Sequence, residues 1–425
     1  MIRERKPNNA RSRSPRGDRD RDRGFSSVRR PAVSRETLLA RQRAKEERLL
    51  REQESRELAR GPIDLPFCLL VLLLTAIGLI MLFSASFPRA YYESGNPTYY
   101  VSKQGVFAIM GVAAMAFVGK INYQRFRGLA KPLMFLAIIL LVLVIIPGNP
   151  FALTVNRATR WLGIRGTALQ FQPSEVAKLA VVLYFSDSVS KKKERMQTFR
   201  YGILPYGMIL VVLAALMMLE PHLSGTLLIL GAGAAIMLVG GIGWGWVGGA
   251  LGVAAAGMYA VVGIIGYGAS RIAMWQNPFI DPRGDGYQLS QSLLSIGSGG
   301  LLGVGLGKSR QKFMYLPEEH NDFVFSIVCE ELGLIGAAVI MLLFAALILR
   351  GYWIGLHARD RFGSLLVVGV TTLLAFQTFL NMAVVTGLLP TTGVSLPFFS
   401  YGGTALTIQL FEMGIVLSVS RQMKM

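Results

Sequence analysis

The sequence predicts an all-α polytopic membrane protein with about ten transmembrane helices. Of the 425 residues, 52% are hydrophobic and only 16% are charged, and the mean hydropathy is +0.46. This composition is typical of a chain that crosses a bilayer repeatedly, and not of a soluble multidomain protein. Apolar runs long enough to span the hydrocarbon core lie at residues 63–84, 103–119, 132–147, 174–189, 202–219, 225–241, 245–268, 323–349, 364–387 and 400–419.

The charges of the connecting loops predict how these helices are oriented. The basic loops lie at residues 120–131, 190–200 and 350–361. They alternate along the chain with longer or less basic loops. Because cytoplasmic loops carry the excess of Lys and Arg, we expect both termini in the cytoplasm. The loop 148–173 falls on the opposite, outer side, although it carries Arg157 and Arg160. Arginines on that side suggest that they hold an anionic group.

Residues 1–60 precede the first predicted helix and form a separate basic segment. They hold 19 Lys and Arg against 10 Asp and Glu. The first part is low in complexity and is expected to be disordered, whereas the charge spacing of residues 35–60 favours a polar helix near the membrane surface. We therefore predict a largely disordered cytoplasmic tail at 1–60 and a ten-helix membrane domain at 61–425. The net charge of +19 is mainly a topology signal, and nucleic acid is not an expected partner.

Cysteine and histidine patterns indicate neither a disulfide framework nor a zinc site. Cys68 and Cys329 lie far apart in apolar runs, and the three histidines are scattered along the chain. Neither residue type shows a pairing or metal-ligand spacing.

The longest outer loop, at residues 269–322, precedes the eighth predicted helix. It is too long for a plain connector, because most connections in compact domains are much shorter. A short amphipathic or re-entrant helix is expected within it, around Tyr287–Ile296.

Asp322 stands at the end of this loop, where polar sequence meets the apolar run of the eighth helix. Glu318, Glu319 and His320 directly precede it. A carboxylate at membrane depth is costly and therefore points to a function. Two interpretations remain open from spacing alone. Asp322 is either a general base at the outer mouth of a cavity or, like Asn321, a candidate N-cap of the helix.

Glu330 and Glu331 lie deeper in the same predicted helix. An α-helix rises about 1.5 Å and turns about 100° per residue, which puts Glu330 roughly 12 Å below Asp322 and Glu331 on the nearly opposite face. On a straight helix the two glutamates cannot share a site with Asp322. Packing or gating is the role we expect for them.

Glu175 and Lys178 are a second charged pair, near the start of another predicted helix. Side chains three residues apart share one helix face. A charged pair inside an apolar segment faces protein or water and not lipid, and it serves either a site or, as the structural alternative, helix packing. Gln377 and Asn381, one turn apart, are expected to form helix–helix hydrogen bonds.

Two Pro/Gly-rich segments complete the pattern. Turn chemistry alone explains the segment at 220–226. The segment at 389–403 holds two prolines and three glycines, so irregular backbone is expected there, of the kind tolerated where it lines protein or a wet cavity.

Several blocks of sequence, taken in order, resemble the SEDS family (shape, elongation, division and sporulation), the polytopic glycosyltransferases of bacterial cell-wall synthesis. The resemblance spans about residues 62–422. The blocks are Arg160-Trp161-Leu162 with Gln172-Pro173-Ser174-Glu175, Arg271 followed by Asn277-Pro278, Gly286-Tyr287-Gln288 with Gln291-Ser292, Tyr315-Leu316-Pro317-Glu318 with His320-Asn321-Asp322-Phe323, Glu330-Glu331-Leu332-Gly333, and Leu396-Pro397-Phe398 with Ser400-Tyr401-Gly402-Gly403. The cell-division branch fits better than the elongation branch, with a sporulation paralogue as the alternative.

This resemblance implies polymerisation of the substrate lipid II into glycan strands at the outer face of the bacterial cytoplasmic membrane, at the division septum. Asp322 matches the family's essential aspartate, which implies a general base acting on the acceptor sugar hydroxyl. The leaving pyrophosphate needs positive charge. Candidates to supply it are Arg157, Arg160, Arg271 and Lys312. A divalent cation, Mg or Mn, is the alternative source of charge.

The resemblance also implies further substrate-binding residues and partners. Glu175 and Lys178 match the family's conserved pair and are expected to line the cavity. Gln288, His320 and Ser400 are the remaining candidate substrate-binding residues. The expected partners are a cognate class B penicillin-binding protein, which is a transpeptidase, and other divisome membrane proteins.

The sequence departs from the family pattern at the turn 220–226. The family usually has an aspartate where this chain has His222, so no catalytic role is assigned to the turn. Asn321 replaces the commoner threonine. Two other function classes remain open as alternatives: a lipid II flippase, and a non-catalytic divisome scaffold.

Overall fold

The computed structural model describes residues 42–46, 49–50, 61–155, 158–164, 170–243, 245–246, 248–249, 252 and 269–423. The chain forms two compact units, Met1–Gln53 and Glu54–Met425. In the first unit, residues 42–46 and 49–50 are helical, inside the region for which the sequence predicts a polar helix. The disorder predicted for the first part of the tail falls on residues outside the described ones and stays a prediction.

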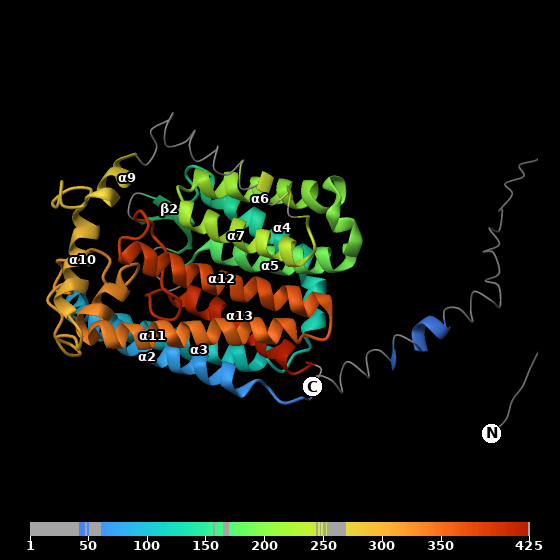
Figure 1. The fold of residues 1–425 in the computed structure, drawn as a ribbon, viewed down its shortest axis with the longest axis horizontal. Coiled ribbons are helices and arrows are strands. Elements are labelled where there is room, and N and C mark those ends of the chain that lie inside the picture. The colour runs from blue at the N-terminus through green and yellow to red at the C-terminus, as the bar shows by residue number, and fades with distance from the viewer. Residues whose placement is uncertain are drawn as a thin grey trace, which may run out of the picture. The chain divides into compact units, whose positions relative to one another are not determined.

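The second unit is a helical membrane domain, as predicted (Figure 1). Seven helical segments among the described residues are long and apolar enough to cross a membrane: α2 (Leu65–Ser94), α3 (Tyr99–Val118), η1 with α4 (Tyr123–Arg125, Phe126–Ile145), η3 with α6 (Phe199–Ile203, Leu204–Leu219), α11 (Val324–Leu356), α12 (Arg361–Val385) and α13 (Gly403–Ser420). Two further predicted spans are occupied by α5 (Pro173–Lys192) and α7 (Leu223–Val239), and the short helix η2 (Lys193–Gln197) follows α5. The predicted span at 245–268 lies largely outside the described residues.

Helices α12 and α13 form the centre of the domain. In each, more than three fifths of the most apolar stretch is buried, against two fifths or less in the other candidate spans. Helix α12 packs on α5, α7 and α11, and α13 packs on α3, so the two lie between these groups of helices in Figure 1. The surrounding helices are apolar on every side because one face meets protein and the other faces lipid.

Both ends of the membrane domain lie on the side of the basic loop that follows α3. The Arg421 side chain donates to the backbone carbonyls of Gly61, at 2.8 Å, and Gly119, at 3.3 Å. Ser420 Oγ accepts from the backbone N–H of Asp64. The start of α2, the end of α13 and the end of α3 therefore meet, which agrees with the prediction that both termini share the cytoplasmic side.

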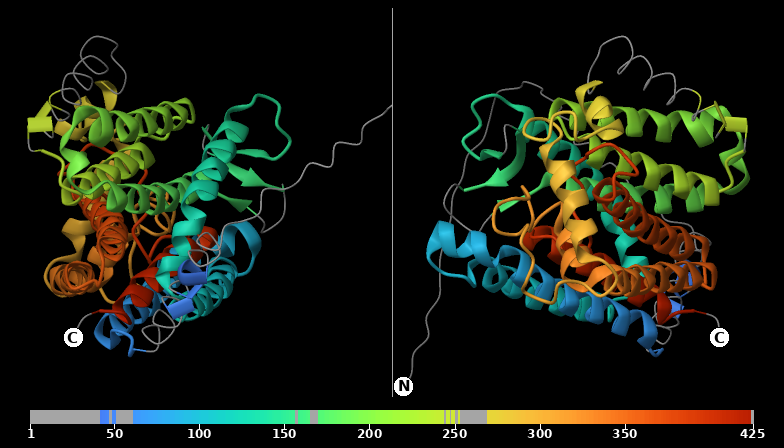
Figure 2. Two further views of the ribbon diagram at one scale, coloured as in Figure 1. Left: turned by 90° about the vertical axis from the view of Figure 1, so that its right-hand side faces the viewer. Right: turned by 60° about the vertical axis from the view of Figure 1, so that its left-hand side comes forward.

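A small antiparallel sheet on the outer side was not predicted. Its order is β1–β2–β3, built from β1 (Ala152–Val155), β2 (Ala158–Gly163) and β3 (Gln170–Phe171), and it is visible beside α4 and α5 in Figure 2. Helix α4 and the sheet follow one another directly, and β2 packs against both α4 and α5. Strands this short carry little periodicity, so an all-α assignment passes over them.

The long outer loop holds α9 (Ala269–Gln276) and α10 (Tyr287–Gly299). Helix α10 confirms the short helix expected around Tyr287. The glycine-rich stretch after it pairs with α11, because the backbone N–H of Val304 donates to the carbonyl of Glu330 and that of Leu334 donates to the carbonyl of Gly300.

Helix α11 is kinked where this stretch meets it. Gly333 has φ 67° and ψ −171°, a left-handed conformation that favours glycine. A Cβ atom there would lie 2.3 Å from the backbone nitrogen of Gly303. The span predicted at 323–349 is confirmed by α11. The helix is not straight, however, because the loop backbone lies close to Gly333.

Candidate active site

Asp322 lies in the turn that leads into α11 and does not cap it. The N-cap position is Phe323, and no side chain makes a capping hydrogen bond there. The turn closes on Glu318 instead, whose backbone carbonyl accepts from the N–H groups of Asn321, at 3.0 Å, and Phe323, at 3.3 Å. The helix-cap interpretation is therefore wrong, and the general-base interpretation remains.

The carboxylate of Asp322 has no hydrogen-bond partner among the described residues, whereas its backbone carbonyl is bound by Asn381 Nδ2 at 2.7 Å. Its Oδ2 faces Gly393, where an added Cβ would lie 2.9 Å away. The side chain is only partly buried. Its side chain thus faces Gly393 on one side, and no described residue donates a hydrogen bond to its carboxylate.

The electrostatic surroundings hold the pKa of Asp322 well above the ordinary value of an aspartate. Burial raises this pKa to about 7, and the charge of Glu318 adds to the increase, while Arg160 and His320 oppose it. A carboxylate whose pKa lies near neutral is matched to proton abstraction at physiological pH. Such matching by burial is common at catalytic sites.

Arg160 projects from β2 onto the turn between α6 and α7. Its guanidinium donates to the backbone carbonyls of Glu220, at 3.1 Å, and Pro221. Its positive charge also acts on Asp322. The sheet therefore delivers one of the predicted arginines to the neighbourhood of the candidate base. Arg157 lies outside the described residues, and of Arg271 only the backbone, in α9, is described.

The turn that binds Arg160 contains two buried titratable groups. Burial raises the pKa of Glu220 to about 8 and lowers that of His222 to about 3. Neither carboxyl oxygen of Glu220 has a hydrogen-bond partner among the described residues. Burial therefore favours the uncharged form of both groups.

His320 and Glu319 link the candidate base to the outer end of α2. Arg89 donates to both carboxyl oxygens of Glu319, at 2.7 and 2.9 Å. The ring of His320 packs against Tyr100 and Tyr401, with centroids 4.8 and 6.0 Å apart. The structure therefore places His320 in an aromatic cluster directly next to the Asp322 turn.

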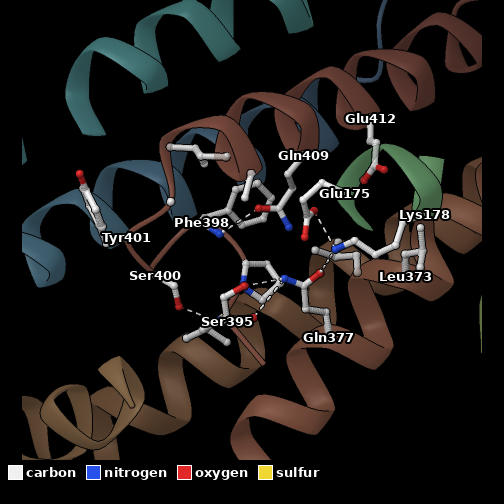
Figure 3. Close-up of a pocket in the computed structure, with 16 residues that line it drawn as sticks. Glu175, Lys178, Leu373, Gln377, Ser395, Phe398, Ser400, Tyr401, Gln409 and Glu412 are labelled. Atoms are coloured by element: carbon white, nitrogen blue, oxygen red, sulfur yellow. Dashed lines mark hydrogen bonds and ion pairs between the residues drawn. The ribbon is translucent and has the colours of Figure 1, made fainter. Parts of the chain in front are cut away.

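Glu175 and Lys178 lie in a polar cavity between α5, α12 and α13 (Figure 3). Lys178 Nζ lies 2.7 Å from Glu175 Oε2 and donates to Gln377 Oε1 at 3.3 Å. The cavity, about 510 Å³ including its open mouth, is lined by Glu175, Lys178, Leu373, Leu374, Gln377, Ser395, Leu396, Pro397, Phe398, Ser400, Tyr401, Gly402, Ala405, Leu406, Gln409 and Glu412. Asp322 does not line it. Ser400 connects the two, since its hydroxyl donates to the backbone carbonyl of Asn321 at 2.7 Å.

Lys312 is placed in a buried ion pair and not in the open site. Its Nζ lies 2.9 Å from Glu331 Oε1 and 3.1 Å from Ser84 Oγ, and its side chain is 3% exposed. Glu330 accepts from Ser309 Oγ and from the backbone N–H of Arg310. These contacts clamp the outer loop onto α11 and α2. They give Lys312 a packing role here, and they fit the packing role expected for the two glutamates.

Gln288 and a metal ion were the remaining expectations. Gln288 lies partly buried on α10. The part of the chain that the structure describes holds no group of three or more His, Cys, Asp and Glu side chains that could bind a metal ion. Dependence on Mg or Mn stays a prediction.

Gln377 and Asn381 contact the site from α12. They were expected to bond neighbouring helices, and Gln377 does so, because its Oε1 accepts from Lys178 of α5. Its Nε2 also donates to the carbonyl of Ser395, whereas Asn381 Nδ2 donates to the carbonyls of Val394 and Asp322. In the sequence, the two residues are spaced one helical turn apart and precede a Pro/Gly-rich segment. This pattern does not indicate which groups their side chains bind.

These features define the class of protein: a multi-pass membrane protein with a polar cavity between its central helices and, beside it, a carboxylate that no described residue binds through a hydrogen bond. The chain belongs to the FtsW/RodA/SpoVE family, whose model, described as cell cycle protein, matches residues 65–425. This membership confirms the resemblance to the SEDS proteins.

Named relatives and solved structures agree with this assignment. The probable peptidoglycan glycosyltransferase FtsW of Geobacter metallireducens is 42% identical over 362 residues, covering 85% of this chain and 95% of the relative. Stage V sporulation protein E of Bacillus subtilis is 40% identical over 370 residues, covering 84% and 97%. A structure of a peptidoglycan synthase complex that coordinates polymerization and crosslinking matches with a TM-score of 0.70 at 26% identity, covering 85% of this chain and 98% of that one. The rod shape determining protein RodA of Thermus thermophilus matches with a TM-score of 0.61 at 27% identity, covering 86% and 98%.

Proposed function

We propose that this protein is a peptidoglycan glycosyltransferase that polymerises lipid II into glycan strands at the outer face of the cytoplasmic membrane. The observation that carries the proposal is the Asp322 carboxylate, which has no hydrogen-bond partner among the described residues and a pKa raised by burial to about 7. Relatives at 42% identity carry the name of this activity. A role in septal wall synthesis accords with the division proteins among them.

In the proposed reaction Asp322 is the general base. The acceptor sugar hydroxyl gives its proton to the carboxylate while its oxygen forms a bond to the anomeric carbon of the donor. The bond from that carbon to the pyrophosphate oxygen breaks, and the polyprenyl pyrophosphate leaves with the bonding electrons. Positioned base catalysis of this kind contributes about 10²- to 10⁴-fold to a rate.

Positive charge near the site stabilises the departing pyrophosphate. Arg160 is the described candidate, because its charge acts on Asp322. A cation aimed at developing negative charge is worth most in a water-poor site. Arg157 and Arg271 stay candidates for the same role, and Lys312 is withdrawn because Glu331 already neutralises it.

The proposed partner is a class B penicillin-binding protein, whose transpeptidase would crosslink the strands made here. The similarity to a component of a solved peptidoglycan synthase complex supports a working complex of two enzymes. Location at the division septum and contacts with other divisome proteins belong to the same proposal.

The test is polymerisation of fluorescently labelled lipid II by the purified protein with its partner. Asp322→Asn should fold, bind lipid II and lose at least about a hundredfold in polymerisation rate. Parallel assays with EDTA, Mg²⁺ or Mn²⁺ measure the requirement for a cation.

Normal polymerisation by Asp322→Asn would overturn the assignment of Asp322 as the general base. If the wild type translocates lipid II across vesicles without forming strands, the flippase alternative replaces the enzyme. A mutant without activity in vitro that still supports division favours the scaffold.

A further inference from the structure

Three consecutive backbone carbonyls at the candidate base are each held by a different donor. The carbonyl of His320 accepts from the backbone N–H of Tyr401 at 2.9 Å. The carbonyl of Asn321 accepts from Ser400 Oγ at 2.7 Å, and that of Asp322 from Asn381 Nδ2 at 2.7 Å. All the donors come from α12 or from the segment between α12 and α13, at least 59 residues away in the sequence.

These bonds fix the direction in which the Asp322 side chain leaves the backbone. The Asn321 carbonyl lies in the peptide plane before the Asp322 Cα atom, and the Asp322 carbonyl lies in the plane after it. Peptide units are planar, so bonds to the carbonyls on both sides of its Cα atom restrict φ and ψ of Asp322. Gly393 lies against the side chain on one side.

Asn381 is suited to this role by its own surroundings. Its side chain is 1% exposed, and Nδ2 donates both to Asp322 O and to Val394 O, at 2.7 and 2.6 Å. Because both partners are acceptors, the orientation of the amide is settled: a rotated amide would turn its oxygen toward two other oxygens. The same side chain thus ties the base to the segment that lines the cavity.

One helical turn away, Gln377 extends the same arrangement to the intramembrane ion pair. Its Nε2 donates to the carbonyl and hydroxyl oxygens of Ser395, at 3.1 and 3.2 Å, and its Oε1 accepts from Lys178. Ser395 directly follows Val394, which Asn381 binds. A continuous set of contacts therefore runs from the charged pair in the cavity to the backbone of the candidate base.

We propose that Asn381 and Ser400 are positioning residues that aim the Asp322 carboxylate, and that Gln377 anchors them to the cavity. The proposal rests on the proposed function of Asp322. In this proposal, Asn381, Gln377 and Ser400 affect the rate of proton abstraction by Asp322. They do not affect the binding of lipid II. A misplacement of about 1 Å at a catalytic group costs on the order of a hundredfold in rate.

The decisive variant is Asn381→Leu, which removes both donated hydrogen bonds at similar side-chain volume. The matched control is Thr378→Val, three residues earlier in α12. Among the described residues, the buried Thr378 hydroxyl binds only the carbonyl of Leu374 in its own helix. For each folded protein, the binding of labelled lipid II, the single-turnover rate and the pH dependence of that rate are measured with the partner enzyme present.

Asn381→Leu should bind lipid II within about twofold of the wild type and lose about 10- to 100-fold in rate. Burial raises the pKa of Asp322, so an Asp322 carboxylate that moves toward water should have a lower pKa. The acid limb of the pH–rate profile should therefore shift to lower pH by about half a pH unit or more. Thr378→Val should match the wild type in all three measurements. A purely structural role for Asn381 would reduce the yield of folded protein without moving the rate or the acid limb of the folded fraction.

Wild-type rate and pH profile in folded Asn381→Leu would overturn the proposal. If Asn381→Leu does not fold, Ser400→Ala is measured in its place. The same fall in rate and the same shift of the acid limb are expected for it. A wild-type rate and pH profile in folded Ser400→Ala would likewise contradict the proposal. Asp322→Asn is measured in parallel. If Asp322→Asn is inactive and the positioning variant is fully active, the positioning role is wrong and the proposed function of Asp322 stands. If Asp322→Asn is active, the proposed function of Asp322 is itself wrong.

Discussion

A Cβ atom on Gly393 would lie only 2.9 Å from Oδ2 of Asp322, so the missing side chain of one residue makes room for the carboxylate of the other. Contacts below about 3 Å force something to shift, and the end of the Asp322 side chain is the part that can move. Gly393→Ala should therefore lower the polymerisation rate by about tenfold or more while leaving lipid II binding unchanged.

The control for this variant is Gly128→Ala in α4, where an added Cβ meets no atom within 4 Å. Alanine in a helix interior is favoured over glycine by about 0.5–1 kcal/mol, so that variant should be fully active and slightly more stable. Single-turnover assays with labelled lipid II compare the two. Equal rates for both glycine variants would contradict the role given to Gly393.

The pH dependence of the rate should report the titration of Asp322. Burial raises its pKa to about 7, and a general base acts only when deprotonated, so the rate should rise with pH through about 7. Glu318→Gln removes a negative charge that raises this pKa and should move the midpoint to lower pH. Arg160→Gln removes a positive charge that lowers it and should move the midpoint to higher pH. The expected shifts are about half a unit.

Rates measured from about pH 5.5 to pH 9 under single-turnover conditions give the two midpoints. The wild type and Asn321→Thr, which keeps both charges, are the references. Shifts of the same sign in the two charge variants would show that the measured group is not Asp322.

The buried pair of Lys312 and Glu331 should contribute to stability as a unit. Lys312→Met leaves the Glu331 carboxylate buried with hydrogen bonds from Ser84 and the Ser309 backbone but without a counter-charge, and removal of one partner of a buried pair costs about 3–5 kcal/mol. Lys312→Met combined with Glu331→Gln should recover most of that loss. Lys103→Met, at a half-buried lysine of α3 that binds only the exposed Tyr99 hydroxyl among the described residues, should change stability by less than about 0.5 kcal/mol.

Unfolding of the purified variants in detergent measures these differences. A double variant no more stable than Lys312→Met alone would mean that the lysine acts through some contact other than the charge of Glu331.

The pair of Glu175 and Lys178 offers a test of whether the cavity binds substrate. Lys178→Met leaves Glu175 without its ion-pair partner and should destabilise the protein by about 3 kcal/mol. Glu175→Gln with Lys178→Met should restore stability. If the cavity receives an anionic group of lipid II, the double variant should still bind lipid II about tenfold more weakly, since charge-assisted contacts are about twice as strong as neutral ones.

Binding of labelled lipid II and unfolding in detergent are measured on the same preparations. Normal affinity in the stable double variant would assign the pair to helix packing, the structural alternative that the sequence leaves open.

The sequence allowed the fold class, most spans, the α10 helix and the family to be predicted, because each depends on local patterns. Spans follow from apolar run length, and the kink at Gly333 was missed because it depends on contact with Gly303. The sheet was missed because its strands are too short to show a period. The Asp322 cap was left open because capping depends on the backbone of the next residue.

The sequence by itself determined that Asp322, Glu175 and Lys178 need an explanation, because charge at membrane depth is costly wherever the chain folds. Only the tertiary structure decided what surrounds them. Lys312 turned toward Glu331 and not toward the site, and Asn381 reached the Asp322 carbonyl and not a neighbouring helix. Partners 19 and 59 residues apart are chosen by packing, since a buried polar group bonds to whichever group the fold brings within reach.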